Sequence, residues 1–264
     1  MPSLNEITVQ QLCRLVGLPD APHIVDVREP AACRSTPHIL PTARNLDVRD
    51  IRNWGAAYRD ARVVVYCSDG GPLSRGVVAW LRDDGAHAEV LTGGFNAWAQ
   101  ANQPLVRTER VPARDERGST VWVTRQRPKI VRVACPWLIR RFVDPLARFL
   151  FVAPSEVPAV AERFKAEPFD TGHGLWNDRG ENCTFDIMLD AFGLRTEPLE
   201  RLAGIIRGAD TGKLDLAPEC AGLLAASLGF SRMYRDDTAQ LDAAMALYDA
   251  YYRWCRDASD ETHG

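Results

Sequence analysis

Short apolar runs alternate with amphipathic stretches over the first hundred residues, and this alternation is the feature that most limits the fold. The runs are IVDV at 24–27, RVVVY at 62–66 and AEVL at 88–91, with helical patterns between them. Strands that alternate with helices in this way assemble into a parallel sheet with helices on its faces. We therefore predict an α/β domain over residues 1–108, built as a parallel sheet flanked by helices.

The composition changes beyond this domain. Residues 109–128 are rich in Pro, Arg and Glu and lack an amphipathic period, apart from VWV, a candidate short strand, so we interpret this stretch as a linker. Helical patterns dominate residues 129–264, with KIVRV and ARFLFV as the expected strands, which predicts a mainly helical α+β domain. The last helix is expected to bury one face made of Leu241, Ala244, Tyr248, Tyr251 and Cys255.

Charge and cysteine content disfavour several classes of protein. The 264 residues carry a net charge of -3, which argues against DNA as a partner. The seven cysteines form no CxxC pair in a chain too long for a disulfide scaffold, so we expect reduced thiols. We find neither a signal peptide nor an apolar run of roughly 18 residues. We therefore expect a cytoplasmic protein with no membrane partner, of either monomeric or oligomeric state.

The segment VVVYCSDGGPLSRGVVAWL carries the chemistry of the first domain. A buried strand ends at Tyr66, Cys67 follows at once, and a Gly-rich loop leads into a helix expected to begin near Ser74. Gly70 and Gly71 can adopt backbone angles that turn successive N–H groups toward the sulfur, while the helix dipole adds positive potential. Both effects favour a nucleophilic thiolate. A nucleotide-binding P-loop is excluded because the GK[ST] ending is absent.

Several separated segments resemble the rhodanese family in its usual order. They are IVDVREP with Asp26 and Arg28, PHILPTARNL in place of a GHIPGA-like turn, the Cys67 loop, and LTGGFNAW at 91–98. The resemblance implies that Cys67 accepts a sulfane sulfur as a persulfide, that Asp26 and Arg28 shape the neighbouring loop, and that thiosulfate and an acceptor thiol are partners, with no cofactor. The implied anion-binding loop comprises Ser68, Asp69, Gly70, Gly71, Pro72, Leu73, Ser74 and Arg75.

This chain departs from the family inside that loop. A typical sulfurtransferase closes a shorter loop with an arginine, whereas Pro72 and Leu73 stand here and the next arginine is Arg75. Related phosphatases and arsenate reductases have a longer loop with an arginine where Leu73 stands, which disfavours a phosphatase. Many rhodanese domains attached to other modules are weak enzymes or inactive sensors, so a role without turnover stays open.

The second domain resembles the carboxy-terminal domain of the chromate-resistance protein B family over residues 129–256. The segments that carry the resemblance are KIVRVACPWLIRRFVDP, PFDTGHG, CTFD and RGADTGKLDL. Family members accompany chromate exporters, and some regulate transcription through an amino-terminal segment that contacts DNA. Because a rhodanese-like domain takes that place here, the resemblance implies detoxification or sensing of chromate or a related oxyanion. Chromate, like sulfate, is a tetrahedral dianion that suits backbone amides and Arg side chains.

Two kinds of site are compatible with the polar residues of the second domain. In one, His173, Cys183 and Asp186, with Cys135 as a further candidate, bind a metal ion such as zinc or iron, since imidazole, thiolate and carboxylate are competent ligands. In the other, arginines gather around an oxyanion and a cysteine acts as a redox-active thiol. The candidates for this second site are Arg132, Cys135, Arg140, Arg141, Arg207 and Asp210, with Cys183 as the other thiol.

Purely structural roles compete with both sites. Cys135 would be a small buried helix residue, Asp186 would cap or pair within TFDIMLDAF, and Asp210 would end its helix against Arg207. For the whole chain, two hypotheses follow. In the first, it is an enzyme, a sulfurtransferase that acts in detoxification of chromate or another oxyanion. In the second, it is a non-catalytic sensor whose Cys67 loop holds chromate, sulfate or another small anion.

Overall fold

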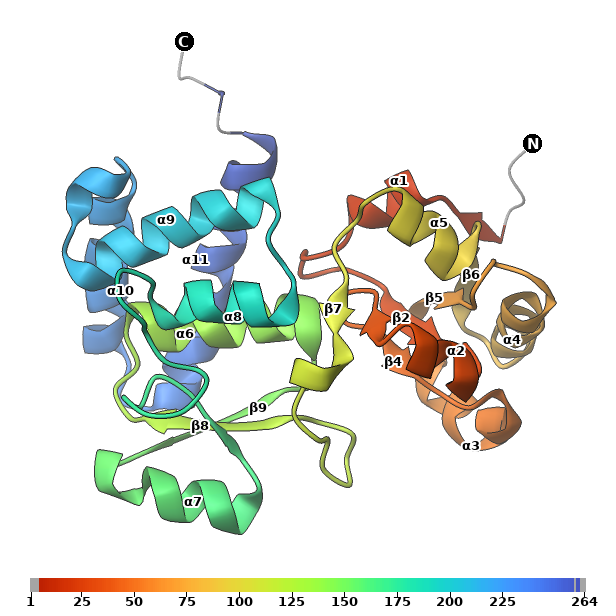
Figure 1. The fold of residues 1–264 in the computed structure, drawn as a ribbon, viewed down its shortest axis with the longest axis horizontal. Coiled ribbons are helices and arrows are strands. Elements are labelled where there is room, and N and C mark those ends of the chain that lie inside the picture. The colour runs from red at the N-terminus through yellow and green to blue at the C-terminus, as the bar shows by residue number, and fades with distance from the viewer. Residues whose placement is uncertain (1–4, 259, 262–264) are drawn as a thin grey trace. The chain divides into compact units, whose positions relative to one another are not determined.

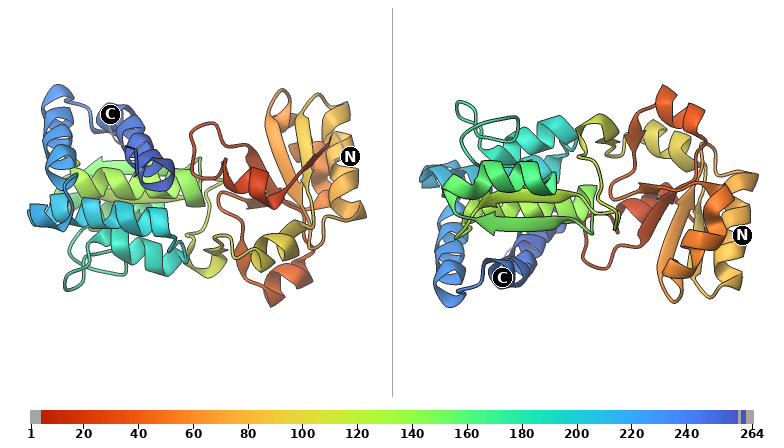
Figure 2. Two further views of the ribbon diagram at one scale, coloured as in Figure 1. Left: turned by 90° about the horizontal axis from the view of Figure 1, so that it is seen from above. Right: turned by 90° about the horizontal axis from the view of Figure 1, so that it is seen from below.

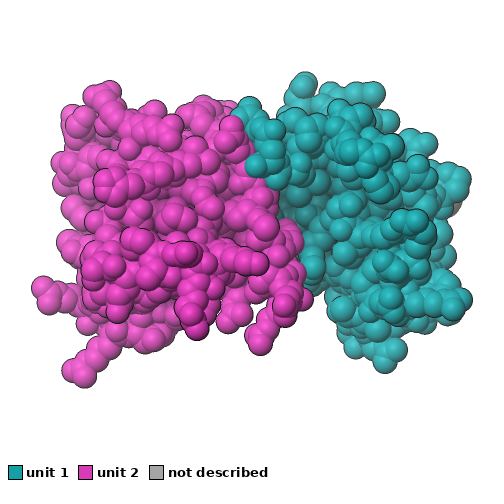
Figure 3. All heavy atoms as spheres, turned by 60° about the horizontal axis from the view of Figure 1, so that its bottom comes forward, with its two compact units in different colours: residues 1–109, 141–143 teal, residues 110–140, 144–264 magenta. Residues whose placement is uncertain are grey.

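The computed structural model of the chain describes residues 5–258, 260 and 261. It divides into two compact units, shown in teal and magenta in Figure 3. The first unit comprises residues 1–109 together with 141–143, and the second comprises residues 110–140 and 144–264. Within the described part of the chain, none of the helices combines the length and the apolar composition that crossing a bilayer requires.

The first unit is built on a five-stranded sheet in the order β1-β6-β5-β2-β4, in which every neighbouring pair is parallel. The strands are β1 Glu6–Ile7, β2 His23–Asp26, β4 Arg44–Asn45, β5 Arg62–Tyr66 and β6 His87–Leu91. The three predicted apolar runs are therefore confirmed as β2, β5 and β6, the three adjacent central strands. Central strands of a parallel sheet are buried on both faces, which explains their continuous apolar sequence.

Helices cover both faces of this sheet, which confirms the predicted α/β class. They are α1 Val9–Cys13, α2 Pro30–Ser35, α3 Ile51–Trp54, α4 Pro72–Asp83 and α5 Gly94–Gln100. On one face, Ile51 of α3 and Leu81 of α4 pack with Val65 of β5 in a single core. On the other face, Phe95 of α5 stacks on Tyr66, and α1 lies beside α5 (Figure 1). Neighbouring residues of β5 thus point to opposite, equally buried layers.

Shorter elements complete the first unit. A two-stranded antiparallel pair joins β3 His38–Ile39 to β7 Val106–Arg107. The 3₁₀ turns are η1 Val48–Asp50, η2 Gly55–Tyr58 and η3 Thr108–Arg110. The β3–β7 pair ties the end of this unit back to the segment that follows α2.

The second unit contains a three-stranded parallel sheet in the order β10-β8-β9. The strands are β8 Val121–Arg125, β9 Arg148–Val152 and β10 Glu167–Pro168. The central strand β8 lies inside residues 109–128, the range interpreted as a linker. Trp122 and Val123 are both fully buried on opposite faces of the sheet, so β8 lacks the polar and apolar alternation that would have marked a longer strand. Within residues 109–128, the VWV run was the only sequence feature that indicated this strand.

Helices make up most of the rest of the second unit, as predicted. They are α6 Ile130–Leu138, α7 Val157–Phe164, α8 Thr184–Phe192, α9 Glu197–Thr211, α10 Cys220–Met233 and α11 Asp237–Asp257, with the short helical turns η4 Ile139–Val143, η5 Pro154–Glu156 and η6 Leu214–Leu216. The prediction of a strand at KIVRV was wrong. These residues lie in α6, where every residue except Arg132 is buried, and periodicity alone cannot distinguish a fully buried helix from a buried strand.

The small sheet of the second unit lies between helices. Val157 of α7 packs on the face that carries Val123, and the view from below in Figure 2 brings α7 in front of the strands. On the opposite face, the ring of Trp122 meets those of Phe169 and Trp176, with centroids 6.2 and 5.7 Å apart. Full burial of such aromatic rings is a large apolar contribution to the stability of this unit.

The last helix, α11, buries the predicted face with one change. Leu241, Ala244, Tyr248 and Cys255 are buried, whereas Tyr251 is only partly covered and Tyr252 takes its place in the core. The Tyr248 hydroxyl donates a hydrogen bond to the carbonyl oxygen of Ile130, at 2.9 Å. This bond fixes α11 against the first turn of α6, which carries the candidate site of the second unit.

Candidate functional site

Cys67 lies directly after β5, at the carboxyl edge of the parallel sheet, where ligand sites of open α/β sheets form. The residue is buried, with 4% of its surface exposed. Its sulfur has two polar neighbours, Ser74 Oγ and Asp69 Oδ1, each 3.3 Å away. The Ser74 hydroxyl also donates to the carbonyl oxygen of Gly71, at 3.1 Å. The sulfur is therefore held between a hydroxyl from α4 and a carboxylate from its own loop.

The start of α5 fixes the path of the Cys67 loop. The backbone N–H groups of Phe95 and Asn96 donate to the carbonyl oxygens of Cys67 and Ser68, both at 2.9 Å. Gly94 has a φ of +55°, and a Cβ there would lie 2.4 Å from the Cys67 carbonyl oxygen. Gly70 has a φ of +71°, and a Cβ added at this position would lie 2.7 Å from a backbone oxygen of β6. Both positions require glycine because of backbone angle and space.

The helix after the loop begins earlier than predicted. α4 starts at Pro72 with Gly71 as its N-cap, two residues before Ser74. Proline fits this position because its missing N–H and fixed φ suit the first turn of a helix. Two of the expected amides are thereby unavailable to the sulfur, since Pro72 has no N–H and Gly71 N–H donates to Asp69 Oδ1 at 3.0 Å. The backbone cradle is smaller than the loop sequence indicates.

The side chain of Arg75 forms an ion pair outside the Cys67 loop. Its guanidinium pairs with Glu6 Oε1 of β1 at 2.6 Å, and more than half of its side chain is exposed. It therefore ties α4 to the edge strand and does not take the place of the arginine that closes the loop of a typical sulfurtransferase. Ser74 is the loop residue whose side chain reaches the sulfur from α4, and its hydroxyl is fully buried.

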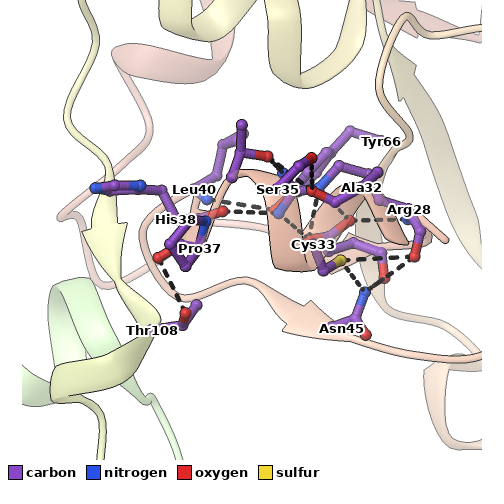
Figure 4. Close-up of polar contacts among 12 residues, drawn as sticks. Arg28, Ala32, Cys33, Ser35, Pro37, His38, Leu40, Asn45, Tyr66 and Thr108 are labelled. Carbon is purple, nitrogen blue, oxygen red and sulfur yellow. Dashed lines mark hydrogen bonds and ion pairs between the residues drawn. The ribbon is translucent and has the colours of Figure 1, made fainter. Parts of the chain in front are cut away.

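Asp26 and Arg28 form a buried ion pair in the frame around the loop. Arg28 Nη2 lies 2.7 Å from Asp26 Oδ2, and both side chains are at most 1% exposed. The same guanidinium donates to the carbonyl oxygen of His38 at 2.7 Å (Figure 4). It also lies 4.0 Å from the centroid of the Phe95 ring. The pair thus connects β2 to β3 and α5, the helix that holds the Cys67 loop.

A second thiol of the first unit lies close to this frame. Cys33 of α2 has its sulfur 3.5 Å from Asn45 Nδ2 and 3.7 Å from the Arg28 carbonyl oxygen (Figure 4). Burial, followed by the charge of Asp26, raises the pKa of Cys33. A thiol with a raised pKa is a weak nucleophile, so Cys33 is a suitable reference for Cys67.

A cavity of about 660 Å³ in the first unit includes one residue of the Cys67 loop. Leu73, which is exposed, forms part of its wall. Arg34 of α2 and Arg49 of η1 contribute positive charge to the same wall. This space can admit a small molecule beside the loop, and the charges of its wall are mixed, since Arg49 is paired with Asp47 and Glu29 also lines it.

The second unit contains a polar cavity of about 280 Å³ where the ends of several elements meet. Lys129 is the N-cap of α6, Cys183 is the N-cap of α8, and Asp210 lies near the end of α9. The full lining is Arg125, Lys129, Val131, Arg132, Asp170, Asp178, Gly180, Glu181, Asn182, Cys183, Thr184, Asp210 and Thr211. The segments KIVRV, PFDTGHG, CTFD and RGADT, far apart in sequence, all contribute to it.

Asp170 organises one wall of this cavity. Its Oδ2 accepts from Arg125 Nη2 at 3.0 Å and lies 3.3 Å from Arg132 Nε, while its Oδ1 accepts from the Thr184 hydroxyl at 3.2 Å. Asp170 was not among the predicted site residues, although it lies two residues after the short strand β10, in the PFDTGHG segment. Lys129 contributes a free positive charge, since none of the described residues forms an ion pair with it.

Asp210 faces this cavity and does not end its helix against Arg207, so that structural prediction was wrong. The backbone N–H of Val131 lies near enough to its carboxylate to favour the ionised form. Burial, and then the nearby charge of Asp170, raise the pKa of Asp210 to about 6. The carboxyl therefore changes charge close to neutral pH, although its exposure to solvent at the cavity reduces the energetic consequence.

The predicted arginines do not converge on one point. Arg140 pairs with Asp242 of α11 and Arg207 pairs with Asp186 of α8, each at 2.8 Å. Arg141 lies in the turn η4 and is grouped with the first unit. Of the four candidates, Arg132 is the member that lines the cavity. Arg140 and Arg207 are each paired with an acidic residue that is distant in sequence.

The three candidate metal ligands are brought together only in part. Among the described residues, no group of three or more His, Cys, Asp or Glu side chains is arranged to hold a metal ion. Asp186 accepts from the backbone N–H and the thiol of Cys183, at 3.0 and 3.2 Å, which is the capping role weighed as the structural alternative. His173 is exposed, ten residues before Cys183 in the loop that leads from β10 to α8.

The thiols of the second unit are poorly suited to redox chemistry. Burial, and then the charge of Asp186, raise the pKa of Cys183 to about 12. Burial raises the pKa of the fully enclosed Cys135 well above its usual range. Because the thiolate is the reactive form, both residues are held as unreactive thiols.

Comparison with known families fits both units. Residues 122–255, just over half of the chain, match the model of the ChrB C-terminal domain. The chain belongs to this family. Residues 8–101 match the model of the rhodanese-like domain, so a rhodanese-like domain precedes the ChrB C-terminal domain in one polypeptide.

Individual proteins are similar to parts of the chain. The chain is 32% identical to protein ChrB of Cupriavidus metallidurans over 174 residues, which cover 63% of this chain and 52% of that protein. It thus spans about half the length of that relative. A rhodanese-related protein of Thermoplasma volcanium is 24% identical, with a TM-score of 0.34 over 39% of this chain and 97% of that chain. A rhodanese-like domain protein of Staphylococcus aureus is 26% identical, with a TM-score of 0.32 over 36% and 91%.

Proposed function

We propose that Cys67 accepts a sulfane sulfur as a persulfide and that the chain uses this chemistry in resistance to chromate or a related oxyanion. The observation that carries the proposal is the position of the sulfur. It lies after the central strand β5, at the sheet edge, with the Ser74 hydroxyl 3.3 Å away. When the thiol is ionised or carries a sulfur, the single Ser74 hydroxyl proton can turn from the Gly71 carbonyl oxygen to the thiolate or to the terminal sulfur of the persulfide and so stabilise its negative charge.

The proposed step is a displacement at sulfur. The Cys67 sulfur attacks the sulfane sulfur of the donor and forms a new S–S bond, while the bond from the sulfane sulfur to the leaving group breaks and the leaving group keeps the electron pair. An acceptor thiol then takes the sulfur from the persulfide and restores Cys67. The cavity that includes Leu73 offers space for the organic part of a donor or acceptor.

The first prediction concerns the nucleophile itself. We expect Cys67→Ser to abolish persulfide formation, because a serine hydroxyl does not attack sulfane sulfur under these conditions. Cys33→Ser, which removes the reference thiol of α2, should retain it. The measurement is mass spectrometry of the full chain after incubation with thiosulfate or with glutathione persulfide. Absence of an added sulfur on Cys67 with both donors would overturn the proposal and leave the loop as an anion-binding or sensing element.

A second candidate function is recognition of the oxyanion in the ChrB C-terminal domain. Lys129, which lacks an ion-pair partner among the described residues, faces the cavity together with Arg132. A tetrahedral dianion can accept hydrogen bonds from both side chains. The carboxylates of the lining, Asp210 above all, oppose this binding when they are ionised.

The second prediction concerns the repulsion between the Asp210 carboxylate and a bound oxyanion. Asp210 has a pKa of about 6, so it is mainly protonated below that pH and negatively charged above it. We expect sulfate, a stand-in for chromate that does not titrate in this range, to bind more weakly as pH rises through 6. With solvent screening, one added charge should weaken binding roughly tenfold. Isothermal titration at several pH values measures the effect.

Asp210→Asn should remove this pH dependence and bind sulfate at neutral pH as the wild-type chain does in acid. Asp215→Asn, an exposed carboxylate of η6 outside the cavity, serves as the control and should keep the wild-type profile. Sulfate binding that is absent, or that shows the same pH profile in the Asp210 variant, would rule out this cavity as the oxyanion site.

A further inference from the structure

The Cys67 loop holds a carboxylate beside its nucleophile. Asp69 Oδ1 lies 3.3 Å from the Cys67 sulfur and accepts the backbone N–H of Gly71 at 3.0 Å. The hydrogen bond from the thiol, together with the one from Gly71, lowers the pKa of Asp69, so it is ionised at neutral pH. The place next to the sulfur, where a cradle for anions would need positive potential, is occupied by a negative charge.

The Cys67 loop leaves space for the Asp69 carboxylate at the position of Gly71. A Cβ at Gly71 would lie 2.8 Å from Asp69 Oδ1, closer than non-bonded atoms approach. Gly71 has a φ of -84°, which any residue can adopt, so backbone angle is not what requires glycine here. The absence of a side chain at Gly71 therefore serves the position of Asp69.

The charged side chains around the Cys67 loop do not neutralise the negative charge of Asp69. Asp26 and Arg28 of the neighbouring strand neutralise each other in their ion pair, as do Glu6 of β1 and Arg75 of α4. None of the described residues forms an ion pair with Asp69. A reactant that approaches the Cys67 sulfur consequently meets a negative charge whose nearest oxygen lies 3.3 Å from that sulfur.

We propose that Asp69 determines the donor specificity of Cys67, favouring organic persulfides over thiosulfate. This inference rests on the proposed sulfur transfer and narrows its substrate class. With thiosulfate, the new S–S bond forms while sulfite leaves as a dianion. The two negative charges of the sulfite group are then repelled by the negative charge of Asp69. With an organic persulfide, Cys67–SH and R–S–SH give Cys67–S–SH and R–SH. The leaving thiolate takes up the proton that Cys67 gives up, and no sulfonate enters the loop.

Asp69→Asn is the direct test in the full chain. The asparagine oxygen can still accept the N–H of Gly71, so the loop keeps its hydrogen bond and loses its charge. We expect the rate of Cys67 persulfide formation from thiosulfate to rise about tenfold or more, as expected for removal of an adjacent like charge. The rate with glutathione persulfide should change much less. Asp83→Asn, at the far end of α4, removes an equal charge and should alter neither rate.

A second measurement separates this inference from sulfur transfer itself. Iodoacetamide and iodoacetate alkylate thiols by the same displacement, but the second carries a negative charge. We expect wild-type Cys67 to favour iodoacetamide strongly and Asp69→Asn to reduce that preference about tenfold. Should no donor persulfidate Cys67, the proposed function fails, and the alkylation ratio still tests Asp69. An unchanged ratio in the Asp69 variant overturns the inference, whichever donors react.

Discussion

Gly94→Ala is expected to lower the rate of Cys67 persulfide formation by roughly 100-fold, the cost of displacing a reacting group by about 1 Å. The new Cβ would lie 2.4 Å from the Cys67 carbonyl oxygen and 2.6 Å from the Gly70 nitrogen, both backbone atoms that cannot rotate away. The φ of +55° at this position adds strain for any residue with a side chain. The loop must move, and the sulfur moves with it.

Gly76→Ala is the matched control for this prediction. Gly76 lies within α4 of the same unit, and nothing lies within 4 Å of the Cβ that alanine would add. Alanine should stabilise the helix by about 0.5 to 1 kcal/mol, because glycine is a poor helix former. Persulfide formation should stay at the wild-type rate. The measurements are mass spectrometry of the Cys67 peptide with glutathione persulfide and circular dichroism of each variant.

The two measurements also distinguish a displaced loop from a lost fold. The expected result for Gly94→Ala is a folded chain with a slow Cys67, since the clash is confined to the loop and the first turn of α5. Wild-type rates in this variant would show that the hydrogen bonds from Phe95 and Asn96 do not fix the reactive geometry. The clash and the φ belong to the GG pair in LTGGFNAW, the segment on which the rhodanese resemblance partly rested.

The sequence was most informative where burial is complete and elements are bounded by turn residues. The central strands β2, β5 and β6 could be predicted because each is a short apolar run between Gly, Pro, Asp or Asn residues. KIVRV has the same appearance but lies in α6, where helices above and beside it bury nearly every side chain. The local pattern of apolar residues therefore indicates burial more reliably than it indicates whether a segment is a helix or a strand.

The candidate sites show a different limit. Cys67 and its glycines could be identified because strand, loop and helix adjoin in sequence. The roles of the arginines could not, since Asp170, Asp186 and Asp242, which pair with Arg132, Arg207 and Arg140, are distant in the chain. Which cation stays available to a ligand depends on those pairings, and among the described residues that line the cavity Lys129 is the cation without an ion-pair partner.

Arg28→Met is expected to destabilise the rhodanese-like domain by about 3 to 5 kcal/mol, the usual cost of leaving a buried charge without its partner. Asp26 is fully buried and would lose the guanidinium that lies 2.7 Å away. The variant also loses the hydrogen bond to the His38 carbonyl and the contact with the Phe95 ring, which hold β3 and α5 in place. Hydrogen exchange of peptides from β5 in urea reports the stability of this domain.

Asp47 and Arg49 provide a control with the same Asp-x-Arg spacing in the same unit. Arg49 Nε donates to Asp47 Oδ1 at 3.0 Å, but this pair lies on the surface, with 83% of the Arg49 side chain exposed. Solvent screens exposed pairs and both partners remain hydrated when separated, so Arg49→Met should leave the unfolding midpoint of the domain nearly unchanged. Equal sensitivity of the two sites would mean that burial does not set the strength of the Asp26–Arg28 pair.

The double variant Asp26→Asn, Arg28→Met tests whether charge or packing carries the effect. Asparagine can still accept the backbone N–H of residue 28, which donates to Asp26 Oδ1 at 2.9 Å, so the turn after β2 keeps its hydrogen bond. If the unpaired charge is the main cost, the double variant should recover most of the stability that Arg28→Met loses. If the contacts of Arg28 with His38 and Phe95 dominate instead, the double variant should be as unstable as the single one. Recovery of stability with a slow Cys67 would then show that Arg28 positions α5, and through it the Cys67 loop, independently of its role in compensating Asp26.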